Sequence, residues 1–244
     1  MRISALTIAL LAAASPALKA ACTAQSAAQD RPHVVELYTA EGCSSCPPAE
    51  RWLSTLRDSS NYIGLEFHVD YWDDLGWHDP FGDARYSARQ RAFAKRAANN
   101  QVYTPQIAVD GRVWKSWPKP PPPEVTETGA PVLNLEVSRA DGIHVKVGGN
   151  SATAGADVYR MFVALSENGL TTSVKAGENR GKQLDHDQVV RDFAGPLQWP
   201  QAEAILKAPA GLDPAKSSVV AFVEDTRSGD IVQAVRLPLA QCPL

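Results

Sequence analysis

Residues 34–48 read Val34-Val35-Glu36-Leu37-Tyr38-Thr39-Ala40-Glu41-Gly42-Cys43-Ser44-Ser45-Cys46-Pro47-Pro48. An apolar strand leads into a glycine turn and a Cys-x-x-Cys pair, and the pattern predicts a helix directly after the pair. A thiol at a helix N-terminus faces unpaired backbone N–H groups and the positive end of the helix dipole, which both favour the thiolate. Pro47 and Pro48 suit the first helical turn, because no N–H donor is needed there. The block therefore predicts a redox centre at Cys43 and Cys46.

The chain of 244 residues is long enough for one large domain or two small ones. Its formal net charge of −3 gives no electrostatic reason to bind nucleic acid or an anionic membrane surface. We therefore expect no nucleic-acid partner.

The first 21 residues have the pattern of a signal peptide. Arg2 precedes a short apolar run, and small residues over 15–21 offer cleavage sites. The run is too short for a membrane-spanning helix and no later stretch is longer, so no transmembrane segment is expected. This predicts a periplasmic or secreted protein. Lipoprotein anchoring at Cys22 is an alternative, although Lys19 matches the corresponding cleavage pattern poorly.

Export determines how the cysteines are interpreted, because thiols are usually oxidised outside the cytoplasm. Four cysteines therefore suggest two disulfides. Cys43 and Cys46 form the local pair by proximity. Cys22 and Cys242 lie near the two ends of the mature chain, and chain termini often lie close together. If signal cleavage falls upstream of Cys22, a structural Cys22–Cys242 disulfide is predicted.

Composition divides the mature chain into four parts. A flexible lead-in covers 22–31, and the segment 118–130 is a Pro-rich linker of the polyproline type. Between them, strands and helices alternate; helices are predicted over 48–56 and 83–99, and strands over 34–39, 63–69 and 102–109. After residue 130, short alternating segments separated by turns predict an antiparallel β-sandwich over 131–244.

Several motifs resemble one family. They are Glu41-Gly42-Cys43-Ser44-Ser45-Cys46-Pro47-Pro48-Ala49, Phe67-His68-Val69-Asp70-Tyr71-Trp72-Asp73, Leu75-Gly76-Trp77, Asp79-Pro80-Phe81, Val102-Tyr103-Thr104-Pro105-Gln106 and Gly177-Glu178-Asn179-Arg180-Gly181. Together they resemble the DUF1223 family of exported bacterial proteins with a thioredoxin-like fold and no assigned function. The resemblance implies an α/β thioredoxin-like domain over 32–117, followed by the mainly β, sandwich-like domain.

The resemblance also implies roles in thiol–disulfide exchange. Cys43 matches the nucleophilic cysteine of the thioredoxin superfamily, and Cys46 matches the resolving one. Thr104 and Pro105 match the cis-proline step that lies against the disulfide and binds a thiol substrate. The expected partner is a protein or a small thiol, and no cofactor or metal is expected.

Further site residues are suggested by their positions. Glu36, in the strand that leads to the cysteines, is a candidate proton acceptor if it is buried, and otherwise a solvated residue at a strand start. His68, Asp70 and Trp72 follow the end of a strand, where open α/β sheets keep their sites, and are candidates for substrate binding. Alternatively, these three residues have packing or loop-forming roles.

Two other functions fit the same residues. Cys43 and Cys46 could handle copper or zinc, with His68 and His78 as further ligands. The protein could also be a non-catalytic binding module in which the Cys43–Cys46 disulfide is structural. In the C-terminal part, Glu178 and His186 are interpreted first as salt-bridging and turn-forming residues.

Overall fold

The computed structural model of the chain describes residues 21–27, 31–97, 100–121, 130–150 and 157–242. The predicted signal peptide, apart from Ala21, and most of the Pro-rich linker lie outside these ranges. Within them, no helix is both long and apolar enough to cross a membrane.

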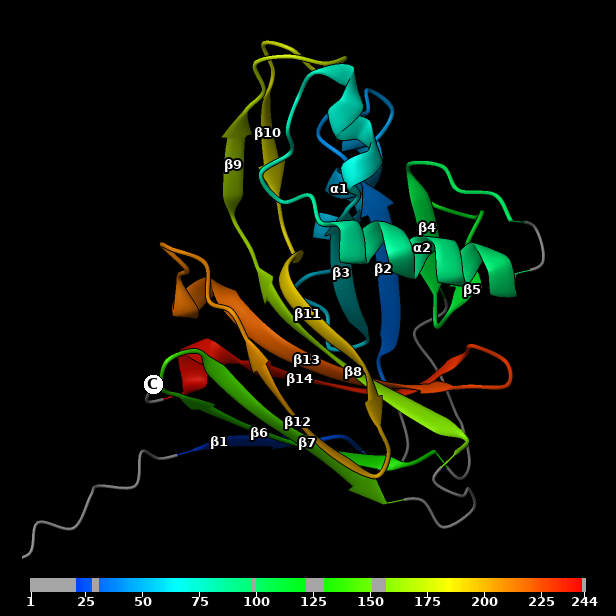
Figure 1. Ribbon diagram of the computed structural model, residues 1–244, viewed down its shortest axis with the longest axis vertical. Helices are drawn as coiled ribbons and strands as arrows, with labels where there is room; N and C mark the ends of the chain where they lie inside the picture. The colour runs from blue at the N-terminus through cyan, green and yellow to red at the C-terminus, as the bar shows by residue number, and fades with distance from the viewer. Residues whose placement is uncertain (1–20, 28–30, 98–99, 122–129, 151–156, 243–244) are drawn as a thin grey trace, which may run out of the picture.

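An eight-stranded sheet runs through the molecule in the order β14-β13-β8-β11-β3-β2-β4-β5 (Figure 1). Half of its strands come from the N-terminal part of the chain: β2 (His33–Thr39), β3 (Tyr62–His68), β4 (Gln106–Val109) and β5 (Arg112–Val113). The other half come from the C-terminal part: β8 (Tyr159–Glu167), β11 (Val189–Gln198), β13 (Ser217–Asp225) and β14 (Ile231–Pro238). One sheet therefore unites strands from both sides of the Pro-rich segment.

The two halves of this sheet meet where β11 pairs with β3. The pairing is parallel, with Val189 opposite Glu66. The residue before Val189 makes most of the connection: Gln188 O accepts from Glu66 N at 2.9 Å, and Gln188 Oε1 accepts from Gly64 N at 2.8 Å. The Gln188 amide also donates to Leu53 O at 3.0 Å. A single buried glutamine thus ties a C-terminal strand to β3 and to the helix that follows the cysteines.

A four-stranded sheet packs beneath the C-terminal half of the large sheet (Figure 1). Its strands, in order, are β1 (Cys22–Gln25), β6 (Val132–Arg139), β7 (Ile143–Asn150) and β12 (Gln201–Leu206). Alternate residues of β6 and β7 point inward and form a common apolar core with β8, β13 and β14. A disulfide joins Cys22 in β1 to Cys242, so the two ends of the described chain are linked covalently.

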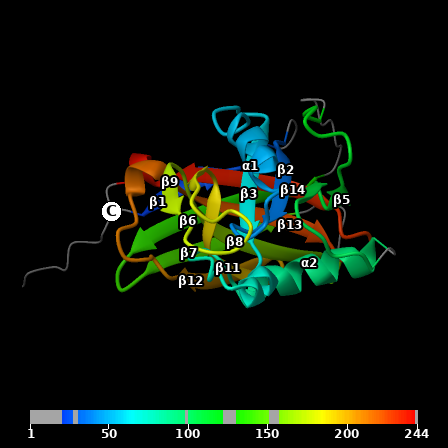
Figure 2. The ribbon, with the colours of Figure 1, turned by 90° about the horizontal axis from the view of Figure 1, so that it is seen from above.

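Helices α1 (Pro47–Ser54) and α2 (Ala84–Arg96) lie on opposite sides of the N-terminal strands (Figure 2). Trp52 and Leu53 of α1 pack against Leu37 of β2, whereas Tyr86 and Phe93 of α2 belong to the cluster on the other face. The remaining elements are the hairpin β9 (Leu170–Ser173) and β10 (Gln183–His186), and the 3-10 helices η1 (Asp70–Leu75), η2 (Pro214–Lys216) and η3 (Leu239–Gln241).

The molecule is mainly β and contains several sheets, as predicted for the C-terminal part. The helices predicted over 48–56 and 83–99 form with slightly shorter bounds. The N-terminal part combines strands with two helices, and its assignment as thioredoxin-like stays a prediction.

The junction between β3 and β11 can be tested at Gly64. A Cβ added to Gly64 would lie 2.6 Å from Cδ of Gln188, whose amide is fixed by two hydrogen bonds. Gly64→Ala should therefore lower the free energy of unfolding by about 1–3 kcal/mol, as overpacking does in other cores. Urea unfolding measures the change. In a double-mutant cycle, Gly64→Ala should lower the free energy of unfolding by less in the Gln188→Ala background, because the Gln188 amide that the added methyl would meet is then absent. Purely additive effects would contradict this packing.

Candidate functional site

The Cys43–Cys46 disulfide lies at the carboxyl end of β2 and the N-terminus of α1. The two residues are bonded to each other. Cys46 is the N-cap of α1, and Pro47 begins the helix. The carbonyl of Cys46 accepts from the backbone N–H groups of Ala49 and Glu50, at 2.8 and 3.2 Å. The predicted arrangement of a Cys-x-x-Cys pair opening a helix is therefore present.

Neither cysteine is accessible to solvent. Cys43 and Cys46 are both 0% exposed, and they belong to the apolar cluster under α2. The two serines between them are exposed. A thiol reagent or a substrate therefore meets Ser44 and Ser45 first, and must displace part of the protein to reach either sulfur.

The turn of the β9–β10 hairpin, residues 174–182, is bound to the backbone around Cys43. We call this segment the strap. Asn179 is buried, and its side-chain amide donates to Glu41 O at 2.8 Å and to Cys43 O at 2.9 Å. The exposed Glu178 carboxylate accepts from Ser44 N at 3.0 Å and from Ser44 Oγ at 2.7 Å. These bonds hold the strap over the Cys-x-x-Cys loop.

Two of the predicted substrate-binding residues meet beside the cysteines. Trp72 donates from Nε1 to Thr104 Oγ1 at 2.8 Å and packs against the cluster that contains both cysteines. The Thr104–Pro105 peptide bond is cis. Asp70 instead hydrogen-bonds to Ser87 in α2. Of the predicted group, Trp72 and Thr104 are brought together, and Asp70 is bound elsewhere.

His68 points into a group of buried ionisable residues, which we call the buried polar cluster. Its members are Glu41, Glu50, Glu66, His68, Asp79 and His186, all 2% exposed or less. His68 contacts Asp79 through Nδ1 and Glu66 through Nε2, both at 2.8 Å. His186 Nδ1 lies 3.0 Å from the same Glu66 oxygen, Oε1. Glu66 Oε1 therefore bridges the two imidazoles.

The carboxyl and imidazole groups of this cluster have shifted pKa values. Burial raises the pKa of Glu50 to about 7, and the Glu66 charge adds to the shift while both histidines oppose it. Burial lowers the pKa of His186, but hydrogen bonding to Glu41 and Glu66 outweighs it and raises the pKa to about 9. Burial likewise acts to lower the pKa of His68, and Asp79 and Glu66 hold it well above its usual range. The cluster therefore stabilises positive charge on its imidazoles.

Glu36, the predicted proton acceptor, is buried in an ion pair. Its Oε1 lies 2.6 Å from Nε of Arg89 and accepts from the Tyr38 hydroxyl at 3.2 Å. Arg89 also lies 3.7 Å from Glu224 of β13, and its guanidinium stacks 4.6 Å from the ring centre of Phe162. Arg89 of α2 thus joins Glu36 of the N-terminal strand β2 to Glu224 of the C-terminal strand β13.

The remaining histidine of the proposed metal alternative lies apart from this cluster. The His78 side chain is 83% exposed and pairs with Asp73 at 2.6 Å. Within the described ranges, the His, Cys, Asp and Glu donors that converge within 4.8 Å of one another are those of Glu66, His68 and His186. The cysteines are not part of this group.

Sequence reasoning did not select Glu41, Glu50, Glu66, Asp79 or Asn179. Glu66 and His68 alternate with apolar residues, a pattern typical of a strand with one apolar face, whereas β3 is buried on both faces. His186, interpreted from the sequence as salt-bridging, does pair with carboxylates, but in the interior. The one available signal was the density of acidic residues around the Cys-x-x-Cys motif.

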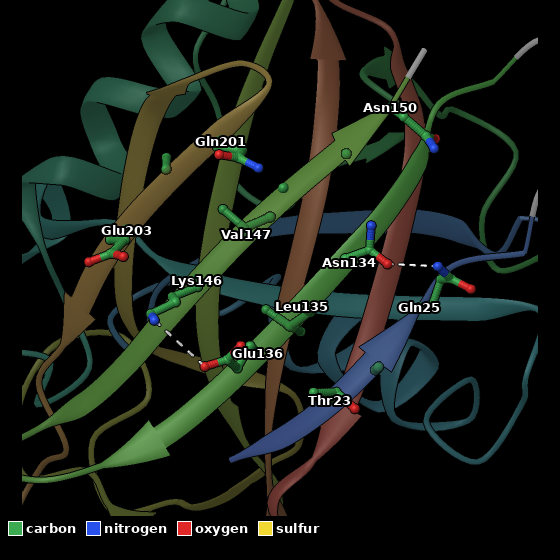
Figure 3. A pocket seen from close by; sticks show the side chains of 14 residues that line it. Thr23, Gln25, Asn134, Leu135, Glu136, Lys146, Val147, Asn150, Gln201 and Glu203 are labelled. Atoms are coloured by element: carbon green, nitrogen blue, oxygen red, sulfur yellow. Dashed lines mark hydrogen bonds and ion pairs between the residues drawn. The ribbon is translucent and has the colours of Figure 1, made fainter. Parts of the chain in front are cut away.

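A surface hollow of about 780 Å³ lies on the outer face of the four-stranded sheet (Figure 3). Figure 1 shows that this sheet lies away from α1. Its polar side chains pair with one another: Gln25 donates to Asn134 Oδ1 at 2.7 Å, and Lys146 lies 3.8 Å from Glu136. None of the predicted site residues lines it.

The chain belongs to the family described as "Protein of unknown function (DUF1223)", whose sequence model matches residues 34–224. A crystal structure of protein AGR_C_4864 from Agrobacterium tumefaciens is similar, at 25% identity and a TM-score of 0.60, over 87% of this chain and 96% of that one. HBP35 of Porphyromonas gingivalis is similar in fold, at 13% identity and a TM-score of 0.60, over 87% of this chain and 76% of that one. No curated protein matches the sequence.

The charged contact at Arg89 can be tested by removing the cation. Arg89→Met keeps much of the side-chain volume but leaves Glu36 without its buried partner, so the free energy of unfolding should fall by about 3–5 kcal/mol. Arg91→Met is the matched control, because Arg91 is exposed on the same helix. Chemical unfolding followed by tryptophan fluorescence measures both. Equal effects of the two substitutions would contradict the role given to Arg89.

Proposed function

We propose that the protein is an exported thiol–disulfide oxidoreductase with a thioredoxin-like N-terminal part. The observation that carries the proposal is the Cys43–Cys46 disulfide at the N-terminus of α1. A helix N-terminus stabilises a thiolate, and a closely spaced disulfide at this place closes so short a loop that it adds little chain entropy to stability. Trp72 and Thr104, two of the predicted substrate-binding residues, are bonded to each other beside it.

The proposed reaction transfers two electrons. In the reduced protein, the Cys43 thiolate attacks a substrate disulfide, forms a mixed disulfide and releases one substrate thiolate. Cys46, after losing its proton, attacks the sulfur of Cys43 and releases the second substrate thiolate. The substrate is reduced and the protein disulfide is formed again. A protein or small-thiol partner then reduces Cys43–Cys46 for the next cycle.

Burial of the disulfide requires a movement before exchange. Because Cys43 is 0% exposed, a substrate sulfur cannot reach it while the strap is closed. The strap is the segment we expect to move, since Asn179 and Glu178 attach it through a small number of hydrogen bonds. Glu178 is exposed, so water competes readily for its bonds with Ser44.

A second function is favoured by the same burial. If the strap never opens, Cys43–Cys46 is a structural disulfide and the protein is a binding module. The two functions differ in reduction potential, because structural disulfides lie below about −300 mV whereas known oxidoreductases lie between about −270 and −120 mV.

The potential is measured by equilibrating the protein in dithiol–disulfide buffers and alkylating the free thiols for mass spectrometry. We expect Cys43–Cys46 to titrate within the oxidoreductase range, and Cys22–Cys242 to remain oxidised there. In Cys46→Ser, a mixed disulfide on Cys43 should accumulate with the substrate. A potential well below about −300 mV, together with no trapped species, would identify a structural disulfide.

The strap is tested by Asn179→Ala. Loss of its two hydrogen bonds to Glu41 O and Cys43 O should favour the open state and speed reduction of Cys43–Cys46 by a phosphine about thirtyfold, since such bonds contribute about 1 kcal/mol each. Lys175→Ala is the control, because Lys175 is an exposed residue of the same strap. Stopped-flow reduction followed by thiol labelling gives the rates. Unchanged reduction in Asn179→Ala would show that the strap does not limit access.

A further inference from the structure

We propose that Glu66, His68 and His186, together with Glu50, form a binding site for one divalent transition-metal ion, of which zinc fits the donors best. The site lies in the buried polar cluster and is separate from the cysteines. It does not depend on the proposed redox function.

The donor atoms already converge. Glu66 Oε1 is 2.8 Å from His68 Nε2 and 3.0 Å from His186 Nδ1, and that same His186 nitrogen is 3.8 Å from Glu50 Oε2. In a tetrahedral zinc site with bonds of about 2.0–2.2 Å, neighbouring donors are about 3.3 Å apart. The observed separations lie on both sides of that value, so the donors of Glu66, His68 and His186, which lie within 4.8 Å of one another, need only small shifts to bind an ion.

Each imidazole is oriented by a carboxylate at its other nitrogen. His68 Nδ1 contacts Asp79 at 2.8 Å, and His186 Nε2 lies 3.3 Å from Glu41 Oε1. This leaves His68 Nε2 and His186 Nδ1 to face Glu66. Metal-binding histidines have this arrangement, in which an outer carboxylate fixes the ring and increases the basicity of the ligating nitrogen.

The fourth donor is held in a similar way. The Thr39 hydroxyl donates to Oε1 of Glu50, so Oε2 is the oxygen that lies near His186. Glu66 and His68 lie two residues apart on β3 and so share a face. Glu50 comes from α1 and His186 from β10. β3 and β10 therefore contribute the three donors that lie within 4.8 Å of one another, and α1 contributes Glu50 beside His186.

An unsatisfied polar atom is a second observation at this place. Glu66 Oε2 is buried and makes no hydrogen bond within the described structure, whereas Glu41 Oε1 and His186 Nε2 lie 3.3 Å apart as an ion pair. Buried polar atoms are nearly always satisfied, because desolvation without a partner is costly. A dication bound by Glu66 and His186 would draw on Glu66 Oε2 as well as Oε1, and would polarise the His186 ring toward Glu41.

The donor set indicates the class of metal. Two imidazole nitrogens with two carboxylate oxygens suit zinc in four-fold coordination, whereas calcium and magnesium prefer oxygen donors alone. Four buried carboxylates, Glu41, Glu50, Glu66 and Asp79, surround the position and favour a positive ion there.

The test is zinc retention by the full mature chain. Because the cluster is buried, the protein is unfolded in urea with its disulfides intact and refolded with or without zinc. It is then dialysed against a weak chelator and analysed for metal and for melting temperature. We expect one zinc per chain and a higher melting temperature in the zinc-refolded sample. Cobalt substitution should give tetrahedral visible bands without a thiolate charge-transfer band.

Variants assign the ligands. Glu66→Gln and His186→Gln should each lower zinc affinity by more than tenfold, and Asp79→Asn, which changes an outer carboxylate, by about 10–100-fold. His78→Gln should bind as the unaltered chain does, because that histidine is exposed and lies outside the cluster. Circular dichroism identifies any variant that does not fold. The zinc affinities of the variants that do fold then decide which residues are ligands.

The outcomes separate the two proposals. Cys43→Ser/Cys46→Ser should keep its zinc although it cannot carry out thiol exchange. The metal site is overturned if the refolded chain retains no zinc. It is also overturned if zinc persists in both Glu66→Gln and His186→Gln, or if it is lost in the double cysteine variant.

Discussion

The pairing of β3 with β11 is the contact on which both parts of the candidate site depend. It places Val189 opposite Glu66 and allows the Gln188 side chain to hydrogen-bond to the backbone of Gly64 and Leu53. His186 lies three residues before Val189, so the same register places its imidazole against the Glu66 carboxylate. The strap precedes His186 in the β9–β10 hairpin and is thereby placed over the Cys-x-x-Cys loop. A single short parallel pairing thus positions a buried ligand and a surface cover together.

This arrangement changes what the cysteine motif means on its own. In isolation, a Cys-x-x-Cys pair at a helix N-terminus presents its first sulfur to solvent. Here the C-terminal part of the chain contributes the strap, whose Asn179 binds the carbonyls on either side of Gly42. Access to Cys43 therefore depends on the stability of a hairpin turn that is distant in sequence. Asn179 and Cys43 are 136 residues apart. The C-terminal half is consequently part of the site.

The sequence allowed local features to be predicted and left long-range ones open. The helix after Cys46 and the helix over 84–96 follow from apolar spacing, and the structure adds that the Asp83 side chain caps the second. The alternating β strands of the C-terminal part follow from period-two patterns. The buried polar cluster could not be predicted in this way. Glu66 and His68 alternate with apolar residues and so resemble the solvent face of a strand; only the covering by α1 and β10, set by tertiary pairing, makes them buried.

The buried polar cluster is physically unusual for a structural element. Ionic groups lose most of their hydration in the interior, and an apolar core of equal volume is often at least as stable. Here four carboxylates and two imidazoles lie side by side, directly beneath a turn that carries a disulfide. Hydrogen bonds satisfy His68 through Asp79 and Glu66, and Glu41 pairs with His186 at 3.3 Å, but Glu66 Oε2 has no partner in the described structure. The proposed cation, bound between His186 and Glu66, would engage the Glu66 oxygen that hydrogen bonding leaves without a partner. Binding of the proposed ion would offset part of the cost of burying these charges.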